Sequence, residues 1–174
     1  MAVFAMFGVL MYASKAAMEP IPNVHPLGML TMTLTLVYRG RALYPIYAYV
    51  LLNGILAGFA PWWLPYLYLW AILWAVTMLL PGKMKRTTAA IVCPLVCALH
   101  GLAFGTLYAP SQALMYGLDW DAMVAWIIAG LPWDAVHAAG NLAMGLLIVP
   151  LTTLTARLSR LAGVPCSAPD WAQP

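Results

Sequence analysis

Charged residues are scarce in this sequence. Of its 174 residues, only 7% are Asp, Glu, Lys or Arg, whereas 64% are hydrophobic. A soluble domain of this size needs far more charge to cover its surface, so the composition excludes an ordinary soluble domain. It indicates instead that lipid surrounds most of the chain. After a bundle of membrane helices, the length leaves no room for a separate soluble catalytic domain.

Cysteine is also rare, and common enzyme motifs are missing. Cys93, Cys97 and Cys166 provide no disulfide framework. The sequence has no phosphate-binding loop of the GxxxxGK[ST] type, no GxSxG turn and no HExxH pair, which argues against hydrolysis of ATP or peptides. Cys93, Cys97 and His100 share one helix face, but three such residues on a single apolar helix make a weak metal site. We therefore expect no metal and no cofactor.

The charged residues divide the sequence into apolar stretches, and we interpret six of these as transmembrane helices. They run roughly over residues 2–17, 24–38, 43–59, 63–80, 88–108 and 134–158. Because a spanning helix needs about 20 apolar residues, the first two are short. Residues 123–131 are too few to cross, and we predict a re-entrant or interfacial segment there. The sequence thus predicts an all-α membrane protein, with one six-helix domain over residues 1–160 and a tail over residues 161–174.

The basic residues are distributed asymmetrically along this pattern. Seven of the eight follow the second, fourth or sixth span: Arg39, Arg41, Lys83, Lys85, Arg86, Arg157 and Arg160. Because basic residues accumulate on the cytoplasmic side of a membrane, both ends of the chain are expected in the cytoplasm. Four of the five acidic residues then face outward: Glu19, Asp119, Asp121 and Asp134.

The strongest polar pattern is expected at the start of the last span. Asp134, His137 and Asn141 are spaced by three and four residues, which places them on one helix face. Polar residues within a membrane normally face a bundle interior or a water-filled cavity, so we favour a role in lining an outward-facing pocket. The alternative is structural: Asp134 as a helix cap and Asn141 as an interhelical hydrogen bond.

A second polar group lies at the outer end of the first span, where Lys15, Glu19, Asn23 and His25 follow one another. Lys15 and Glu19 are four residues apart and can pair with each other. Lys15 can equally hold an anionic ligand group or a carboxylate such as Asp134. The sequence does not choose between these interpretations.

Aromatic residues are concentrated in the segment APWWLPYLYLW, which includes Trp63, Tyr66 and Trp70. Trp and Tyr are common at membrane interfaces, so an aromatic belt is one interpretation. Flat aromatic walls with a few polar groups also suit a small organic ligand. Asn53 and His100 lie deeper, in the third and fifth spans, and are further candidates for ligand contact.

Four motifs, taken together, resemble a known family. They are ASKAAMEPIPN near the N-terminus, RGRALYPIYAYVLLNGILAGF in the third span, WWLPYLYLW at the fourth and GLPWDAVHAAGN at the sixth. Their order and spacing over residues 2–158 are similar to the substrate-binding S component of energy-coupling factor (ECF) transporters.

This resemblance implies a non-enzymatic subunit of an ATP-driven importer in the bacterial cytoplasmic membrane. The subunit would bind a vitamin-like micronutrient from outside, and it would associate with a transmembrane coupling protein and two cytoplasmic ATPases. Small residues in the first helix contact the coupling protein in that family; Ala5, Gly8 and Val9 stand at the matching positions here, with Val9 in place of an alanine.

The substrate implied most directly is cobalamin or a related corrinoid, although a smaller heterocyclic vitamin is also compatible with the residues. The Met-His signature of nickel and cobalt S components is missing. The expected substrate-binding residues are Lys15, Asn23, Asn53, Trp63, Tyr66, Trp70, His100, Trp133, Asp134, His137 and Asn141.

Two other functions remain open from the sequence. One is an integral membrane enzyme that uses Asp134 and His137 as an acid and base near the outer interface, because His titrates near neutrality. The other is a membrane assembly protein without a ligand.

Overall fold

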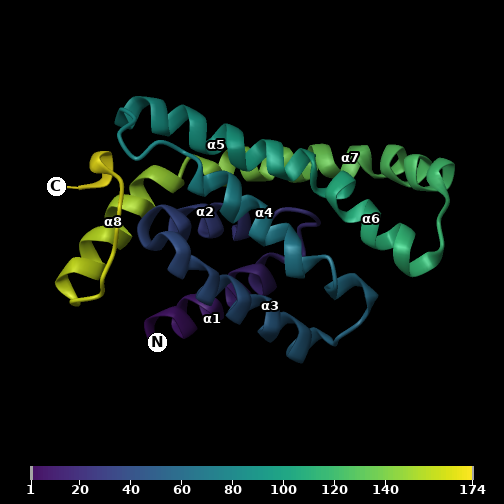
Figure 1. The fold of residues 1–174 in the computed structure, drawn as a ribbon, viewed down its shortest axis with the longest axis horizontal. Coiled ribbons are helices and arrows are strands. Elements are labelled where there is room, and N and C mark those ends of the chain that lie inside the picture. The colour runs from purple at the N-terminus through teal and green to yellow at the C-terminus, as the bar shows by residue number, and fades with distance from the viewer. Residues whose placement is uncertain (1, 174) are drawn as a thin grey trace.

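The computed structural model describes residues 2–173, and these residues form helices and no strand. The α-helices are α1 (Ala2–Met18), α2 (Leu27–Tyr38), α3 (Leu43–Ala57), α4 (Tyr66–Met78), α5 (Arg86–Leu102), α6 (Phe104–Tyr116), α7 (Trp120–Gly145) and α8 (Ile148–Leu161). Short 3-10 turns lie at Arg39–Ala42, Pro61–Trp63 and Asp170–Ala172. Figure 1 shows α5 and α7 side by side along the long axis, with α1 and α3 on the opposite side of α2 and α4.

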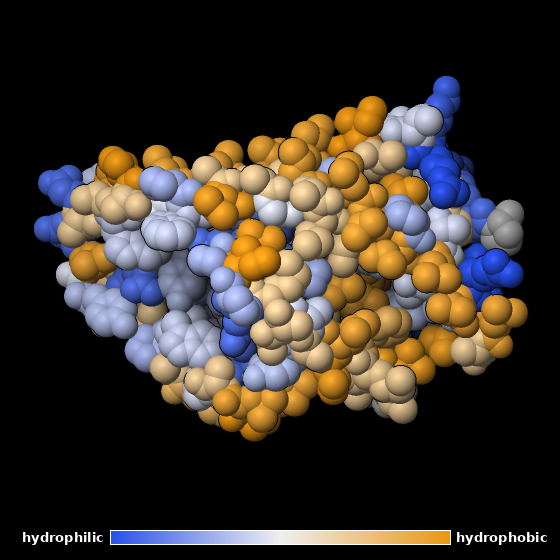
Figure 2. All heavy atoms as spheres, turned by 180° about the vertical axis from the view of Figure 1, so that it is seen from behind, coloured by the Kyte–Doolittle hydropathy of each residue, from blue (hydrophilic) through white to orange (hydrophobic). Residues whose placement is uncertain are grey.

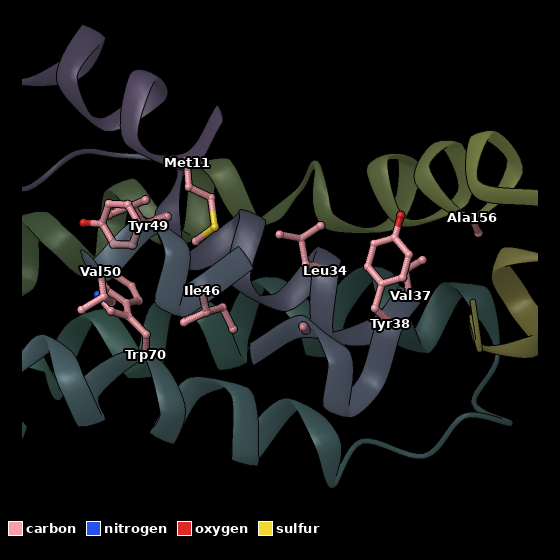
Figure 3. Packing of buried hydrophobic residues seen from close by; sticks show 11 residues of the cluster. Met11, Leu34, Val37, Tyr38, Ile46, Tyr49, Val50, Trp70 and Ala156 are labelled. Carbon is pink, nitrogen blue, oxygen red and sulfur yellow. The ribbon is translucent and has the colours of Figure 1, made fainter. Parts of the chain in front are cut away.

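Helix α2 forms the centre of the bundle. Eleven of its twelve residues are buried, and it packs against α4, α5, α7 and α8. One of its sides joins an apolar cluster with Ile46, Tyr49 and Trp70 (Figure 3). The other side joins a second cluster that includes Cys93 and Cys97. A helix that is apolar all round must be buried in this way or lie in lipid.

Small residues allow the closest helix contacts. A side chain at Gly8 would lie 2.7 Å from the Cβ of Ala48, so glycine is what lets α1 approach α3. A side chain at Gly145 would lie 2.7 Å from the Cα of Pro94, and one at Gly101 would lie 3.0 Å from the carbonyl oxygen of His137. Such contacts between backbones are typical of membrane helices. They hold α7 tightly against α5.

Several predicted boundaries are wrong. Residues 123–131 do not form a separate re-entrant segment, because they belong to the 26-residue helix α7. This helix starts at Asp119, whose side chain accepts a hydrogen bond from the N–H of Ala122, and it continues through Pro132. A proline within a helix removes one backbone hydrogen bond, which neighbouring groups in a membrane helix can replace.

The helix breaks also differ from the prediction. The stretch predicted as the fifth span breaks at Ala103, between α5 and α6, and the stretch predicted as the sixth breaks between Gly145 and Ile148. The C-terminal segment folds back onto the bundle, where the N–H of Ser167 donates to the carbonyl of Val37 and Trp171 is buried. The segment that follows α8, residues 162–173, therefore packs against α2 and α8.

Two helical stretches are long and apolar enough to cross a membrane: Arg86–Tyr116, which comprises α5 and α6, and Trp120–Gly145. The distribution of polarity agrees with this. Large apolar side chains such as Leu79, Leu99 and Leu114 are exposed, whereas Thr31, Asn53 and Asn141 are buried. Figure 2 shows hydrophobic side chains across the middle of the molecule and hydrophilic ones gathered at its two ends. The fold is consistent with a helical membrane protein.

Candidate functional site

The three histidines of the sequence converge in the interior. His25 comes from the connection before α2, His100 from the last turn of α5 and His137 from the middle of α7. The ring centroids of His25 and His137 lie 4.9 Å apart. All three residues are at most partly exposed, and His100 and His137 are buried. Segments that are distant in sequence thus contribute one imidazole each to the same place.

Trp70 and Phe104 complete a closed ring with these histidines, and we call these five residues the histidine cluster. Phe104 lies 4.8 Å from His137 and 6.0 Å from His100, measured between ring centroids. Trp70 lies 5.9 Å from His100 and 6.1 Å from His25. Trp70 and Phe104 also contact each other at 6.0 Å, so each member has at least two neighbours in the cluster. Most of these contacts are edge-to-face, the arrangement that aromatic rings prefer.

The local structure explains why these side chains meet. Trp70 lies on the buried face of α4 with Leu69 and Leu73, and the ring of Tyr49 from α3 packs edge-to-face against it, with 6.1 Å between centroids. Phe104 is the first residue of α6, so the break at Ala103 turns it toward His137. The break between α5 and α6, which the sequence did not predict, is thus needed to close the cluster.

Several polar atoms of the cluster have no hydrogen-bond partner among the described residues. They are Nδ1 of His25, Nδ1 of His100, Nε2 of His137 and Nε1 of Trp70. The one bond from a histidine ring joins Nε2 of His100 to the carbonyl oxygen of Leu69, at 3.1 Å. Buried polar groups are nearly always paired, because leaving one unpaired costs about 1–3 kcal/mol. Four such atoms therefore lie unpaired around one ring of aromatic and histidine side chains.

Burial is the main cause that lowers the pKa of His25 to about 4; nearby Lys15 and His100 add smaller lowering contributions, and a hydrogen bond to its own backbone opposes them. His25 is therefore neutral at pH 7. A neutral imidazole offers one donor and one acceptor.

Asp134 has a structural partner outside the cluster. Its two carboxylate oxygens lie 3.0 and 3.1 Å from the backbone nitrogen of Gly105, which donates to them. Gly105 is in the first turn of α6, so Asp134 caps α6 and not its own helix. Asp134 is therefore a helix cap, as the structural alternative predicted, but it caps α6 and not the helix that contains it. No hydrogen bond joins Asp134 to His137 among the bonds of residues 2–173.

Asn141 and Asn53 are both buried with unsatisfied atoms. Asn141 donates from Nδ2 to the carbonyl of Cys97 at 3.1 Å, and its Oδ1 has no partner among the described residues. Asn53 is fully buried in α3 and makes no side-chain hydrogen bond there. Asn141 therefore makes the interhelical bond that the structural alternative predicted, while its Oδ1 and both polar side-chain atoms of Asn53 have no partner among the described residues.

A pocket of about 180 Å³ opens beside the cluster. It is lined by Lys15, Met18, Glu19, Ile21, Pro22, Asn23, Val24, His25 and Tyr66. His25 belongs to both the pocket and the cluster, and Tyr66 touches both Trp70 and Phe104. The pocket thus leads from the end of α1 to the histidines.

At this pocket Lys15 pairs with Glu19, at 3.0 Å between Nζ and Oε1. The structure therefore shows the first of the two interpretations of Lys15. Asn23 has a positive φ of 58° and donates weakly to the carbonyl of Trp133, at 3.5 Å. The Lys15–Glu19 pair and the side-chain amide of Asn23 form a polar rim around the pocket.

The remaining aromatic candidates lie apart from the cluster. Trp63 donates from Nε1 to the carbonyl of Val50 at 2.7 Å, which fixes the turn before α4. Trp133 is 57% exposed, and its backbone alone reaches the rim through Asn23. These two residues were expected to bind substrate, but the structure places their rings away from the histidines.

The three residues expected at a docking surface of the first helix do not share one environment. Ala5 and Val9 are exposed and line an apolar groove with Met6 and Leu10. Gly8 is buried against α3 and is not part of that exposed face.

No group of three or more His, Cys, Asp or Glu side chains within residues 2–173 has a geometry that could hold a metal ion. Cys93 and Cys97 lie in an apolar core cluster, and the three histidines make edge-to-face and tilted ring contacts.

Sequence reasoning missed Phe104 altogether, and it left His25 out of the substrate-binding residues. One signal in the sequence could have identified His25. It is one of three histidines in the chain, and it lies in the connection between the first two spans, close to Lys15, Glu19 and Asn23. Comparison of the chain with family models, with curated proteins and with solved structures finds no match.

Proposed function

We propose that this chain is the substrate-binding subunit of an ECF-type importer and that the histidine cluster is its substrate site. The observation that carries the proposal is the set of four unpaired polar atoms within a closed aromatic ring, next to an open pocket. A non-catalytic binding site needs such complementary groups and no nucleophile. The four sequence motifs that resemble S components all contribute residues to this site or its surroundings.

The chemistry of the cluster favours an uncharged ligand with an aromatic face. Its walls are aromatic and imidazole rings. Its unpaired nitrogens belong to Trp, which donates one hydrogen bond, and to His, whose ring nitrogens donate or accept one each. Asp134 is engaged with Gly105, and Lys15 with Glu19, so neither charge stands ready for a charged ligand. A heterocyclic compound with both donors and acceptors on its edge matches these groups.

The size of the pocket favours a small member of this class. Sites for drug-sized ligands usually have volumes of about 300–1,000 Å³, which is more than the 180 Å³ present here. A heterocyclic vitamin is therefore the better substrate in this conformation. Cobalamin or another corrinoid, which the sequence motifs suggest, requires the pocket rim to open.

The proposal includes a membrane topology with six crossings and both ends in the cytoplasm. Helices α1 to α4 provide one crossing each, α5 with α6 the fifth, and α7 the sixth, which returns the chain to the cytoplasmic side, where α8 lies. The pocket then faces the outside of a bacterial cytoplasmic membrane, opposite to the basic residues. The exposed face of α1 around Ala5 and Val9 is the proposed contact with a transmembrane coupling protein, which in turn binds two ATPases.

No observation favours the enzyme alternative, because Asp134 bonds to Gly105 and does not form an acid–base pair with His137.

The proposal is tested by titrating purified protein with a panel of vitamins and heterocycles while following tryptophan fluorescence. Trp70 lies within the cluster, so binding should change its emission. The exposed Trp120 provides a matched control: Trp120→Phe should keep the response, and His137→Gln should weaken it at least tenfold. A panel without any response contradicts the proposal.

A further inference from the structure

The basic residues converge at one end of the bundle. Arg39 and Arg41 follow α2, Lys83 lies between α4 and α5, and Arg157 and Arg160 end α8. Side-chain and backbone bonds tie these segments together: Nη2 of Arg39 donates to the carbonyl of Met78, and Tyr38 bonds to Ser159 at 2.6 Å between oxygens. Figure 2 shows hydrophilic side chains gathered at the end where the C-terminus lies. Three segments of the chain thus build one positive surface.

These charges have no carboxylate partner among residues 2–173. The one salt bridge within that range joins Lys15 to Glu19, at the pocket. Asp170 is the single acidic residue of the C-terminal segment, and it forms no salt bridge there. A surface with several unpaired cations and one anion attracts an anionic partner.

Two pockets lie on this surface and share Arg39 and Ser167. One has a volume of about 410 Å³ and is lined by Leu36, Arg39, Leu80, Gly82, Lys83, Ser167, Ala168, Pro169 and Asp170. The other has about 400 Å³ and is lined by Tyr38, Arg39, Gly40, Arg41, Pro165, Cys166 and Ser167. Arg39 therefore stands between two hollows, with a second cation in each.

Arg39 is held firmly in this position. Its φ is +54°, which is unfavourable for a residue with a side chain and costs about 1–3 kcal/mol. Its carbonyl accepts a hydrogen bond from Nε1 of Trp74 at 3.1 Å, and its Nη2 donates at 2.8 Å to the end of α4. A guanidinium has five N–H donors in a planar fork, so several remain for a phosphate.

The C-terminal segment forms the outer wall of both pockets. The N–H of Ser167 donates to the carbonyl of Val37, and the N–H of Asp170 donates to the carbonyl of Gly82. Trp171 is buried and anchors the end of the segment. The pockets are thus built by packed backbone and are not gaps between loose loops.

Exposed apolar side chains lie in the same segments as the cations. Leu79 is next to the Lys83 turn, and Leu158 and Leu161 alternate with Arg157 and Arg160 on the last turns of α8; all three leucines are exposed. A ligand that suits this surface carries a negative head and an apolar body. A phospholipid has both, and basic pockets at the cytoplasmic side of membrane helices are suited to such headgroups.

We propose that the two pockets around Arg39 bind the phosphate headgroup of an anionic phospholipid, with the acyl chains along the exposed leucines. Arg39 and Arg41 hold the phosphate from one side, and Lys83 holds it from the other. This site is separate from the histidine cluster and does not depend on what that cluster binds. It rests on the membrane location of the chain.

The test uses the full chain purified in detergent, with lipid added in mixed micelles. Native mass spectrometry should show that the protein retains phosphatidylglycerol and little phosphatidylcholine. Phosphatidylglycerol should also raise the unfolding temperature more than phosphatidylcholine does. Arg41→Gln, which removes an exposed side chain without a hydrogen bond of its own, should reduce retention at least fivefold. Arg39→Gln should reduce it further, although this variant also loses the bond to Met78.

Two matched variants sharpen the test. Lys85→Gln removes a nearby cation that lines neither pocket and should leave retention unchanged, whereas Asp170→Asn removes the opposing anion and should increase it. Equal losses in Lys85→Gln and Arg41→Gln would mean diffuse attraction and overturn the proposal. It is also overturned if both lipids are retained equally, or if inorganic phosphate or a soluble acidic peptide stabilises the protein as much as phosphatidylglycerol does.

Discussion

The Asp134 carboxylate receives the backbone N–H of Gly105, with its oxygens 3.0 and 3.1 Å from that nitrogen. Asp134 is in α7 and Gly105 in the first turn of α6, so one side chain links two helices at the point where α6 begins. The first N–H groups of a helix have no partner in the helix itself, and a carboxylate there also interacts favourably with the helix dipole. This contact fixes Phe104, the preceding residue, in the histidine cluster.

Gly105→Ala should destabilise the protein, because the added Cβ would overlap the Asp134 carboxylate. Overpacking of this kind costs about 1–3 kcal/mol. Thermal or denaturant unfolding in detergent measures it. Gly130→Ala is the matched control: Gly130 is within α7 with nothing near its missing side chain, so alanine there should be neutral or stabilise by up to about 1 kcal/mol. Equal effects of the two changes would contradict the close approach at Gly105.

Asp134→Ala should lower the free energy of unfolding by about 0.5–2 kcal/mol, the usual cost of losing a cap side chain. Asp134→Asn should cost less, since its amide oxygen can still accept from Gly105. Unfolding in urea compares the two variants. If asparagine proves as harmful as alanine, the charge of Asp134 and not its capping bond is what matters.

Stability should depend on pH through His25. Its pKa in the folded chain is about 4, chiefly because of burial, and the ordinary value is 6.5. Protonation therefore opposes folding: the contribution of the neutral ring is complete above pH 6.5 and is lost as the pH falls toward 4. The unfolding temperature of the natural chain should fall between pH 7 and pH 5, and that of the His25→Gln variant should fall less. A His25→Gln variant with the same pH profile as the natural chain would contradict the burial of a neutral His25.

The Lys15–Glu19 pair should contribute little to stability, because Glu19 is largely exposed. Exposed pairs of this spacing are worth about 0.3–0.5 kcal/mol. Glu19→Gln and Lys15→Gln should therefore change the unfolding free energy by less than about 1 kcal/mol. If Lys15 also contacts ligand, Lys15→Gln should weaken ligand binding and Glu19→Gln should not. An equal loss of affinity in both variants would mean that the pair only shapes the rim of the pocket and that Lys15 makes no ligand contact.

The sequence predicted the helical class, and it predicted which polar residues share a helix face, because composition and spacing carry that information. Asp134, His137 and Asn141 share one buried face, as their spacing of three and four requires. The apolar character of residues 43–59 and 63–80 was likewise sufficient to locate α3 and α4.

The misplaced elements have identifiable causes. The sixth span was predicted to begin at Asp134, but α7 begins at Trp120, because Asp119 caps it there, and the helix continues through Pro132. The break at Ala103 has no proline or charge to mark it, and its partner Asp134 is distant in sequence. Phe104 was missed for the same reason: an apolar residue shows its role only when the helices around it are placed.

The central claim is that the histidine cluster holds a small organic molecule, and mass spectrometry of compounds that copurify with the protein tests it most directly. The natural chain should carry a heterocyclic compound that His137→Gln, folded according to its unfolding temperature, retains at least tenfold less. Purified natural protein without any such compound, also after incubation with the vitamin panel, or equal retention by folded His137→Gln, would contradict the claim.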